Sequence, residues 1–275
     1  MSVEIHGLTL DLSSSGGTAR ILRGISLDVA DGESLGLVGE SGSGKSMTLR
    51  CLLGIEPAGA TVGGSIRVNG RDVRTLPDSE LRRFRATEVA MIAQNPHAAL
   101  NPVLPVRRYL AEGLVDAQGL EPGDASERAT ALLGEVGIAD VERVLAAYPH
   151  QLSGGMLQRV VIAGALAGNP GLLLADEPTT ALDVTTQAEV AAILSEERRD
   201  RGMSMIFVTH DLDLAAAVCD RLAVMRNGEI VETGTAAQLR DRPEHPYTRA
   251  LMAARPLLYG KEGPRASAPP HDASR

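Results

Sequence analysis

GESGSGKS, from Gly39 to Ser46, is the run of residues that says most about how this chain folds. It fits the phosphate-binding pattern G-x-x-x-x-G-K-[ST]. It follows a run that predicts a strand and precedes SMTLRCLLGI, whose apolar spacing predicts a helix. Glycines allow backbone amides to curl around phosphate oxygens, and the N-terminus of the helix adds a favourable dipole. A strand, a glycine-rich turn and a helix in this order favour a phosphate site over a chance Gly/Ser loop.

Each residue of this loop has an expected place around the phosphates of a nucleotide. The Lys45 ammonium is expected to reach the outer phosphates, and the Ser46 hydroxyl to coordinate Mg²⁺. The remaining residues contribute backbone amides to the cradle. The nucleotide-binding residues predicted here are Gly39, Glu40, Ser41, Gly42, Ser43, Gly44, Lys45 and Ser46.

The patterns on either side of the loop predict the architecture. After Pro170 the apolar runs LLLAD, MIFVTH and RLAVM alternate with helical patterns, which is typical of strands buried on both faces of a parallel sheet. The turn dipeptides Asp31-Gly32, Asn69-Gly70 and Asn227-Gly228 each predict an antiparallel hairpin. Residues 97–165 are Pro-rich at first and then helical in pattern. We expect an α/β P-loop NTPase core, with a mainly parallel sheet and flanking helices, an N-terminal antiparallel β subdomain and an inserted α-helical subdomain.

Composition limits the class of protein. The chain has 275 residues, 44% of them hydrophobic, which is enough for one large domain or a core with an insertion. A net charge of −8 and an aromatic content of 2% argue against a protein whose main partner is nucleic acid. Two distant cysteines, Cys51 and Cys219, suit buried thiols in a reducing compartment. Because we find neither a signal peptide nor an apolar run of about 18 residues, we expect a cytoplasmic chain.

Two acids follow the predicted strand in LLLADEP. In an open parallel sheet, ligands bind at the carboxyl ends of the strands, and this is where both acids fall. Asp176 is expected to hold Mg²⁺, and Glu177 to orient or deprotonate an attacking water. For Glu177 taken alone, a solvated charge at a strand end is the alternative.

Two further polar side chains follow other predicted strands. His210 ends the strand in IFVTHD, where it is expected to contact a γ-phosphate; a hydrogen-bonded structural histidine is the alternative. Gln94 follows the strand in MIAQNP, and its neutral side chain suits coordination of Mg²⁺ or of water. The parallel sheet brings both residues to the edge that carries Asp176 and Glu177.

The tetrapeptide LSGG contains no acid and no base. Ser153 is a good N-cap, and Gly154 and Gly155 expose the first amides of the helix that follows, which makes a second anion-binding helix terminus. Since the loop already cradles one nucleotide, the second terminus is inferred to serve the nucleotide of another subunit. An ordinary capped helix is the alternative for the tetrapeptide alone.

Five motifs in a fixed order resemble those of the ATP-binding cassette (ABC) ATPases. The resemblance covers about residues 1–240 and rests on GESGSGKS, Gln94, LSGGM, LLLADEPTTALD and His210. It implies ATP and Mg²⁺ as ligands, and a head-to-tail dimer of nucleotide-binding domains. Each ATP would lie between one subunit's loop and Ser153-Gly154-Gly155 of the other, with Asp183 at the interface.

A narrower resemblance, to the peptide/nickel importers among the ABC ATPases, comes from QNPHAALNP and from RPEHPYTRAL, Arg242 to Leu251. It implies hydrolysis that energises import of peptides or nickel chelates, with a second ATPase, identical or related, and two membrane permease subunits. An extracytoplasmic binding protein would deliver the cargo, and the chain would sit on the cytoplasmic face of the membrane. The domain division expected is 1–240 for the nucleotide-binding domain, 241–260 for an importer segment and 261–275 for a disordered tail.

Other readings stay open at this point. An ABC exporter ATPase uses similar machinery, and HPYTRAL argues against it. A soluble ABC ATPase acting on nucleic acid or ribosomes is a further alternative, although this chain has one cassette and only a little over a hundred residues between Ser46 and Ser153.

The chain departs from the family in two ways. No aromatic residue precedes Phe84, so adenine is expected either to rest on an aliphatic side chain such as Ile21 or to be loosely held. No cysteine follows Cys219, so no iron–sulfur cluster is expected.

Overall fold

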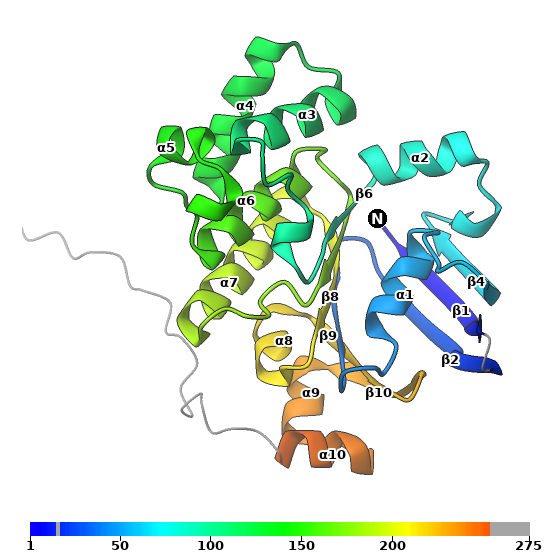
Figure 1. Ribbon diagram of the computed structural model, residues 1–275. Coiled ribbons are helices and arrows are strands. Elements are labelled where there is room, and N and C mark those ends of the chain that lie inside the picture. The colour runs from blue at the N-terminus through cyan, green and yellow to red at the C-terminus, as the bar shows by residue number, and fades with distance from the viewer. Residues whose placement is uncertain (15–16, 254–275) are drawn as a thin grey trace, which may run out of the picture.

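The computed structural model describes residues 1–14 and 17–253, which form two sheets and a group of helices (Figure 1). One sheet is antiparallel in the order β2-β1-β4-β5, and the other has the order β10-β9-β3-β8-β7-β6. In the second sheet every neighbouring pair is parallel except β10 with β9. The tail predicted for residues 261–275 lies outside the described residues, as does the end of the predicted importer segment.

The bounds of the strands are β1 (Val3–Ser14), β2 (Gly17–Val29), β3 (Ser34–Val38), β4 (Ala60–Val68), β5 (Arg71–Asp72), β6 (Val89–Ile92), β7 (Leu172–Asp176), β8 (Ser204–Thr209), β9 (Arg221–Arg226) and β10 (Glu229–Thr235). The α-helices are α1 (Lys45–Leu52), α2 (Asp78–Thr87), α3 (Val106–Gln118), α4 (Pro122–Glu135), α5 (Val141–Ala146), α6 (Gly154–Leu166), α7 (Val184–Arg201), α8 (Leu212–Val218), α9 (Ala236–Asp241) and α10 (Pro246–Ala253). Short 3₁₀ turns lie at η1 (Val73–Thr75), η2 (Pro96–Ala98) and η3 (Pro149–Gln151).

The central strands are apolar throughout because both of their faces are buried. In β8, Met205 and Phe207 pack into one core, whereas Ile206 and Val208 point the other way into a second core. Successive side chains of a strand point to opposite faces, so each strand needs an unbroken apolar run to fill both cores.

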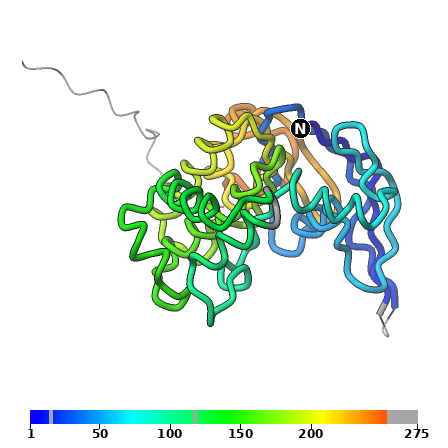
Figure 2. Tube along the Cα trace, turned by 90° about the horizontal axis from the view of Figure 1, so that it is seen from above, coloured from blue at the N-terminus to red at the C-terminus, as the bar shows by residue number. Residues whose placement is uncertain are grey.

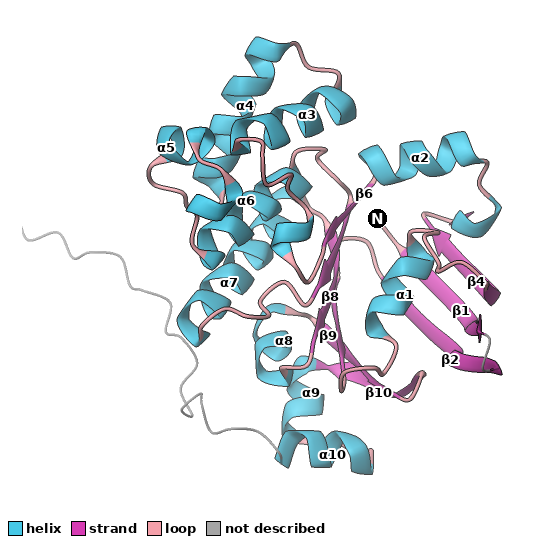
Figure 3. Ribbon diagram, viewed as in Figure 1, coloured by secondary structure: helices cyan, strands magenta, loops and turns pink. Residues whose placement is uncertain are grey.

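The six-stranded sheet lies between the two cores, with the antiparallel sheet on one side of it and most of the helices on the other. One core lies between the antiparallel sheet, α1 and one face of the central sheet, and the other lies between the opposite face and the helices α3 to α8. Seen from above, the helices of residues 106–166 and the antiparallel sheet lie on opposite sides of the molecule (Figure 2). Figure 3 shows the same separation by secondary structure. Within the described ranges, we find no helix with the length and apolar content needed to cross a membrane.

The predicted hairpins were right at two of the three turns. Asn69-Gly70 joins the antiparallel strands β4 and β5, and Asn227-Gly228 joins β9 and β10. The hairpin predicted at Asp31-Gly32 is wrong, because β2 belongs to the antiparallel sheet and β3 to the other. This turn carries the chain from one sheet to the next, since β3 pairs in parallel with β8 and β9.

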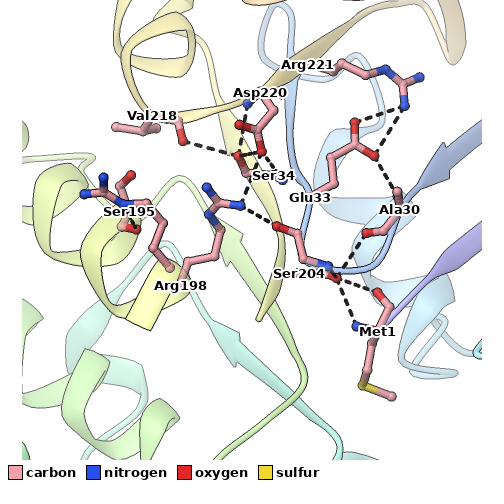
Figure 4. A network of polar contacts seen from close by, with 12 residues as sticks. Met1, Ala30, Glu33, Ser34, Ser195, Arg198, Ser204, Val218, Asp220 and Arg221 are labelled. Carbon is pink, nitrogen blue, oxygen red and sulfur yellow. Dashed lines mark hydrogen bonds and ion pairs between the residues drawn. The ribbon is translucent and has the colours of Figure 1, made fainter. Parts of the chain in front are cut away.

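A polar network built on two buried serines ties together the amino ends of the central strands (Figure 4). The Asp220 carboxylate accepts from Ser34 N at 2.9 Å and from Ser34 Oγ at 2.8 Å, and Arg198 Nη1 lies 3.3 Å from it. Ser204 Oγ donates to the carbonyl of Met1 at 2.6 Å. Ser34 and Ser204 are fully buried, so these hydrogen bonds satisfy polar groups that water cannot reach. The network lies at the sheet edge opposite the loop of residues 39–46.

Candidate nucleotide site

The loop of residues 39–46 joins β3 to α1, as the sequence predicts, and it packs closely on β9. Gly44 is the N-cap of α1 and has φ of 107°, which is strained for any residue with a side chain. A Cβ on Gly39 would lie 2.1 Å from the carbonyl oxygen of Met225, and one on Gly44 would lie 2.7 Å from Met225 Cε. These two positions therefore require glycine, because the end of β9 occupies the space that a side chain needs.

Lys45 carries a buried positive charge at the start of α1. Its side chain is 3% exposed, and its Nζ donates to the carbonyl oxygens of Gly39 at 2.7 Å and Glu40 at 2.9 Å. The Glu177 carboxylate lies 3.9 Å away. Burial lowers the pKa of Lys45, and the attraction of Glu177, Asp176 and Glu40 acts in the opposite direction. A buried ammonium in a ring of backbone groups is well suited to an anionic phosphate.

Ser46 and Asp176 provide two oxygen ligands where the loop meets the end of β7. Ser46 Oγ donates to Asp176 Oδ1 at 2.7 Å. Asp176 is buried, and burial raises the pKa of its carboxyl, assisted by the charge of Glu177 and opposed by Ser46. A divalent cation would relieve the cost of this buried charge, and hydroxyl and carboxylate oxygens are ligands that Mg²⁺ takes. The described residues hold no cluster of three His, Cys, Asp or Glu side chains that could bind a metal ion. The Ser46 hydroxyl and the Asp176 carboxylate are therefore the two oxygen groups that this part of the site offers to Mg²⁺.

Glu177 lies at the centre of a cluster formed by the ends of three strands. Its Oε2 accepts from Gln94 Nε2 at 3.1 Å, and His210 Nδ1 lies 3.7 Å from the same oxygen. Gln94 follows β6, Glu177 follows β7 and His210 follows β8, and these strands are adjacent and parallel. The structure thus brings together the three residues that the sequence placed at one sheet edge.

Thr180 is a member of this cluster that the sequence analysis missed. Its Oγ1 donates to Glu177 Oε2 at 2.9 Å, and its amide donates to the carbonyl of Glu177 at 3.1 Å. Glu177 has φ of 47°, a left-handed conformation that is uncommon for a residue with a side chain. This turn conformation brings Thr180 back onto Glu177. The available signal was a hydroxyl three residues after the acid, in DEPTT.

The helix terminus in LSGG lies apart from the loop of its own chain. Ser153 is the N-cap of α6, and its hydroxyl accepts from the amide of Met156 at 3.3 Å, as expected. Gly155 lies against Thr186, where a Cβ would come within 2.7 Å of Thr186 Cγ2. Asp183 caps α7 by accepting from Thr186 N at 3.1 Å, and its side-chain and backbone bonds with Thr186 lower the pKa of its carboxyl. Among the described residues, no hydrogen bond or ion pair joins Ser153, Gly154 or Gly155 to residues 39–46.

A cavity of about 470 Å³ lies beside the loop, where the turn between β9 and β10 meets β2. Gly228 connects the two, because its amide donates to Ser43 O at 2.9 Å and its carbonyl accepts from Arg23 N at 2.8 Å. The residues lining this cavity are Arg20, Ile21, Arg23, Gly42, Asn227 and Glu229. Ile21, the predicted support for adenine, is thus placed next to the loop.

The comparisons with known proteins agree with this geometry. The model of the ABC transporter family matches residues 22–180, more than half of the chain. The chain belongs to the ABC transporter family. This membership confirms the predicted ABC resemblance and, with it, the ATPase activity that the resemblance implied.

Relatives of this ABC cassette are similar over most of its length. A putative peptide import ATP-binding protein of Brucella abortus is 45% identical over 257 residues, which are 93% of this chain and 77% of the relative. The oligopeptide transport ATP-binding protein OppD of Bacillus subtilis is 43% identical over 258 residues, with 93% and 72% covered. The dimeric ATP-binding cassette MJ0796, solved with ADP and phosphate, superposes with a TM-score of 0.76 at 28% identity over 85% of this chain and 98% of its own. This likeness confirms the predicted P-loop α/β fold.

Proposed function

We propose that this chain is the ATP-hydrolysing subunit of an ABC importer that takes up peptides. The observation that carries the proposal is the meeting of a phosphate-binding loop with Gln94, Glu177 and His210 at one sheet edge, in a chain whose relatives are named for peptide import. Residues 1–240 would form the nucleotide-binding domain, with the helical subdomain of about 97–165 inserted, and 241–260 an importer segment.

The loop would hold the phosphates of ATP. The Lys45 ammonium would leave the carbonyls of Gly39 and Glu40 for the outer phosphates, which neutralise a charge that burial makes costly. Ser46 Oγ and Asp176 would hold Mg²⁺, with Gln94 as a further oxygen ligand. When bound, this ion would neutralise charge that develops on the transferred phosphoryl group.

Glu177 would act as the general base. Its Oε2 already accepts bonds from Thr180 and Gln94, which keep the side chain at the sheet edge, and its Oε1 faces Lys45 at 3.9 Å. A water positioned by this carboxylate would lose a proton to Glu177 while its oxygen attacks the γ-phosphorus, and the bond from that phosphorus to the bridging oxygen would break to release ADP. His210, whose side chain is 64% exposed, would reach the γ-phosphate from the end of β8.

A second cassette, identical or related, would complete the site. The α6 terminus presents the Ser153 hydroxyl and the amides of Gly154 and Gly155, which have no carbonyl partner within the helix and suit a phosphate. The bonds of this terminus within its own chain run to Met156 and not to the loop. We therefore propose a head-to-tail dimer in which the partner's ATP meets these amides and Asp183 lies at the interface. The cavity lined by Ile21 would receive the adenine base.

A membrane permease would dock in the groove between α3, α6 and the end of α1. This groove has a volume of about 480 Å³, and its lining includes Ile55, Arg85, Tyr109 and Gly164. A Cβ on Gly164 would lie 2.4 Å from the Tyr109 ring, so this glycine makes room for the ring at the wall of the groove. Ile55 is 43% exposed, which leaves apolar surface for a partner. The complete transporter would contain two permease subunits, and an extracytoplasmic binding protein would deliver the cargo. The cassette would lie on the cytoplasmic face of the membrane.

Reconstitution tests this proposal. The cassette is co-expressed with candidate permease subunits and inserted into liposomes. We expect ATP-dependent movement of a labelled tripeptide into the compartment that holds the cassette and its product ADP, and loss of that movement in Glu177→Gln. Transport of nickel chelates alone, or movement in the export direction, would contradict peptide import.

A further inference from the structure

The helix α10 places a buried tyrosine against the loop of residues 39–46. Tyr247 is 7% exposed and belongs to the main hydrophobic core, and its neighbour Thr248 is fully buried. In Figure 1, α10 lies at the lower end of the six-stranded sheet, beside α9. The proposed ATPase chemistry makes no use of this helix. Tyr247 contacts the loop at Glu40, although the two residues are 207 positions apart in the sequence.

The Tyr247 hydroxyl is hydrogen-bonded to the backbone of the loop. It accepts from the amide of Glu40 at 3.2 Å. The carbonyl of the same residue accepts from Lys45 Nζ at 2.9 Å and from the amide of Ser43 at 3.2 Å. One loop residue is therefore held by Tyr247 on its amide side, and on its carbonyl side it orients the lysine proposed to bind phosphate.

The tyrosine ring is itself held in place from the sheet. The Arg226 guanidinium lies over the ring, 4.7 Å from its centroid, at a distance that suits a cation–π interaction. Arg226 ends β9, directly before the turn whose Gly228 amide donates to Ser43 O at 2.9 Å. The strand thus contacts the loop directly at Ser43 and indirectly through Tyr247.

The start of α10 is anchored on the edge strand. The Glu232 carboxylate of β10 accepts from the amide of Glu244 at 2.7 Å and from the amide of His245 at 3.1 Å. The amide of Tyr247 in turn donates to His245 Nδ1 at 3.2 Å. These bonds fix where the helix begins, and so they fix the position of the Tyr247 hydroxyl relative to the sheet.

We propose that Tyr247 is a positioning residue for the nucleotide site, which anchors the first turn of the phosphate-binding loop through the amide of Glu40. The amide of Glu40, which the sequence predicts in the phosphate cradle, donates to Tyr247 instead. This bond therefore lies outside the cradle and can persist in the nucleotide-bound state. Its effect is to raise the share of molecules in which the loop, and with it Lys45, is ready to bind. The inference rests on the proposed role of the loop in binding ATP.

Tyr247→Phe tests the inference because it removes only the hydroxyl and keeps the ring beneath Arg226. If one ordinary hydrogen bond holds the competent loop, its loss should weaken ATP binding about threefold to tenfold, since apparent affinity falls with the competent fraction. The KM for ATP should rise by the same factor, while kcat at saturating ATP stays close to that of the wild type. Calorimetric titration with ATP and steady-state phosphate release measure these quantities.

Two controls separate positioning from loss of structure and from failure of the site itself. Leu251→Ala loosens the same helix at a half-buried position that packs on the core without a bond to the loop, so ATP affinity should stay near that of the wild type. An equal loss of affinity in Leu251→Ala and Tyr247→Phe would overturn the inference. So would wild-type affinity in Tyr247→Phe when Lys45→Ala has lost binding. If Lys45→Ala itself binds ATP normally, the proposed site has failed instead.

Discussion

Replacing Glu177 with glutamine removes the proposed proton acceptor and the negative charge that faces Lys45 at 3.9 Å, while it keeps the size of the side chain. The amide oxygen of glutamine still accepts from Gln94 and Thr180, and the left-handed backbone of residue 177 is unchanged. A glutamine cannot take a proton from water, so kcat should fall about 10²-fold to 10⁴-fold, a rise of about 3 to 5 kcal/mol in the barrier.

The stability of Glu177→Gln should change far less than its rate. The hydrogen bonds that Gln94 and Thr180 donate to residue 177 lose a charged acceptor. A bond to a charged acceptor stabilises the fold by about 1 kcal/mol more than a bond to a neutral one. Against this, the substitution removes the carboxylate that helps to raise the pKa of Asp176. We therefore expect a change of no more than about 2 kcal/mol in the free energy of unfolding, and retained ATP binding.

Phosphate release, ATP titration and light scattering measure these effects in one preparation. The variant should bind ATP, hydrolyse it poorly and accumulate as an ATP-bound dimer, because the closed state is no longer reset. Glu127→Gln, at an exposed position of α4, controls for the loss of a negative charge. Hydrolysis by a folded Glu177→Gln within about threefold of the wild type would refute the assignment of the base.

Three further predictions concern the composite site, its protonation and the opposite edge of the sheet. Mixing a Ser153 variant with Lys45→Ala should restore at most one intact site per dimer in a hydrolysis assay, and activity independent of the partner would contradict the shared site. Because burial raises the pKa of Asp176, the nucleotide-free fold takes up a proton that the unfolded chain does not. Its stability should therefore fall as pH rises through that pKa, and Asp176→Asn should flatten this slope in denaturant titrations from about pH 4 to 7. Ser34→Ala breaks the bonds that the buried Ser34 hydroxyl makes with Asp220 and should cost about 1 to 3 kcal/mol in urea unfolding, without altering ATP affinity.

Much of the site could be predicted because its residues follow strands in short local patterns. The loop reads directly from GESGSGKS, where Gly39 and Gly44 stand at positions that admit no side chain. Gln94 and His210 were placed correctly beside Glu177 because parallel strands end at one edge, so each strand end carries its next residues there. Unbroken apolar runs sufficed to predict strands buried on both faces.

The turn at Asp31-Gly32 shows where local patterns stop being informative. Its sequence suits a hairpin, yet β3 takes its partners from β8 and β9, more than 160 residues further along the chain. A turn dipeptide indicates that the chain bends locally, whereas the pairing of a strand depends on which distant strand packs beside it in the sheet. The helix α2 was also missed, since it has few apolar residues and its only buried residue is Phe84.

The residue order of this chain therefore determined the phosphate loop, the parallel strands and the acids and amide at their ends, because these depend on neighbours within a few positions. The folded molecule alone placed Thr180 on Glu177 and Tyr247 on the amide of Glu40. Such contacts depend on side-chain direction and on the packing of elements far apart in the chain, which no local pattern specifies.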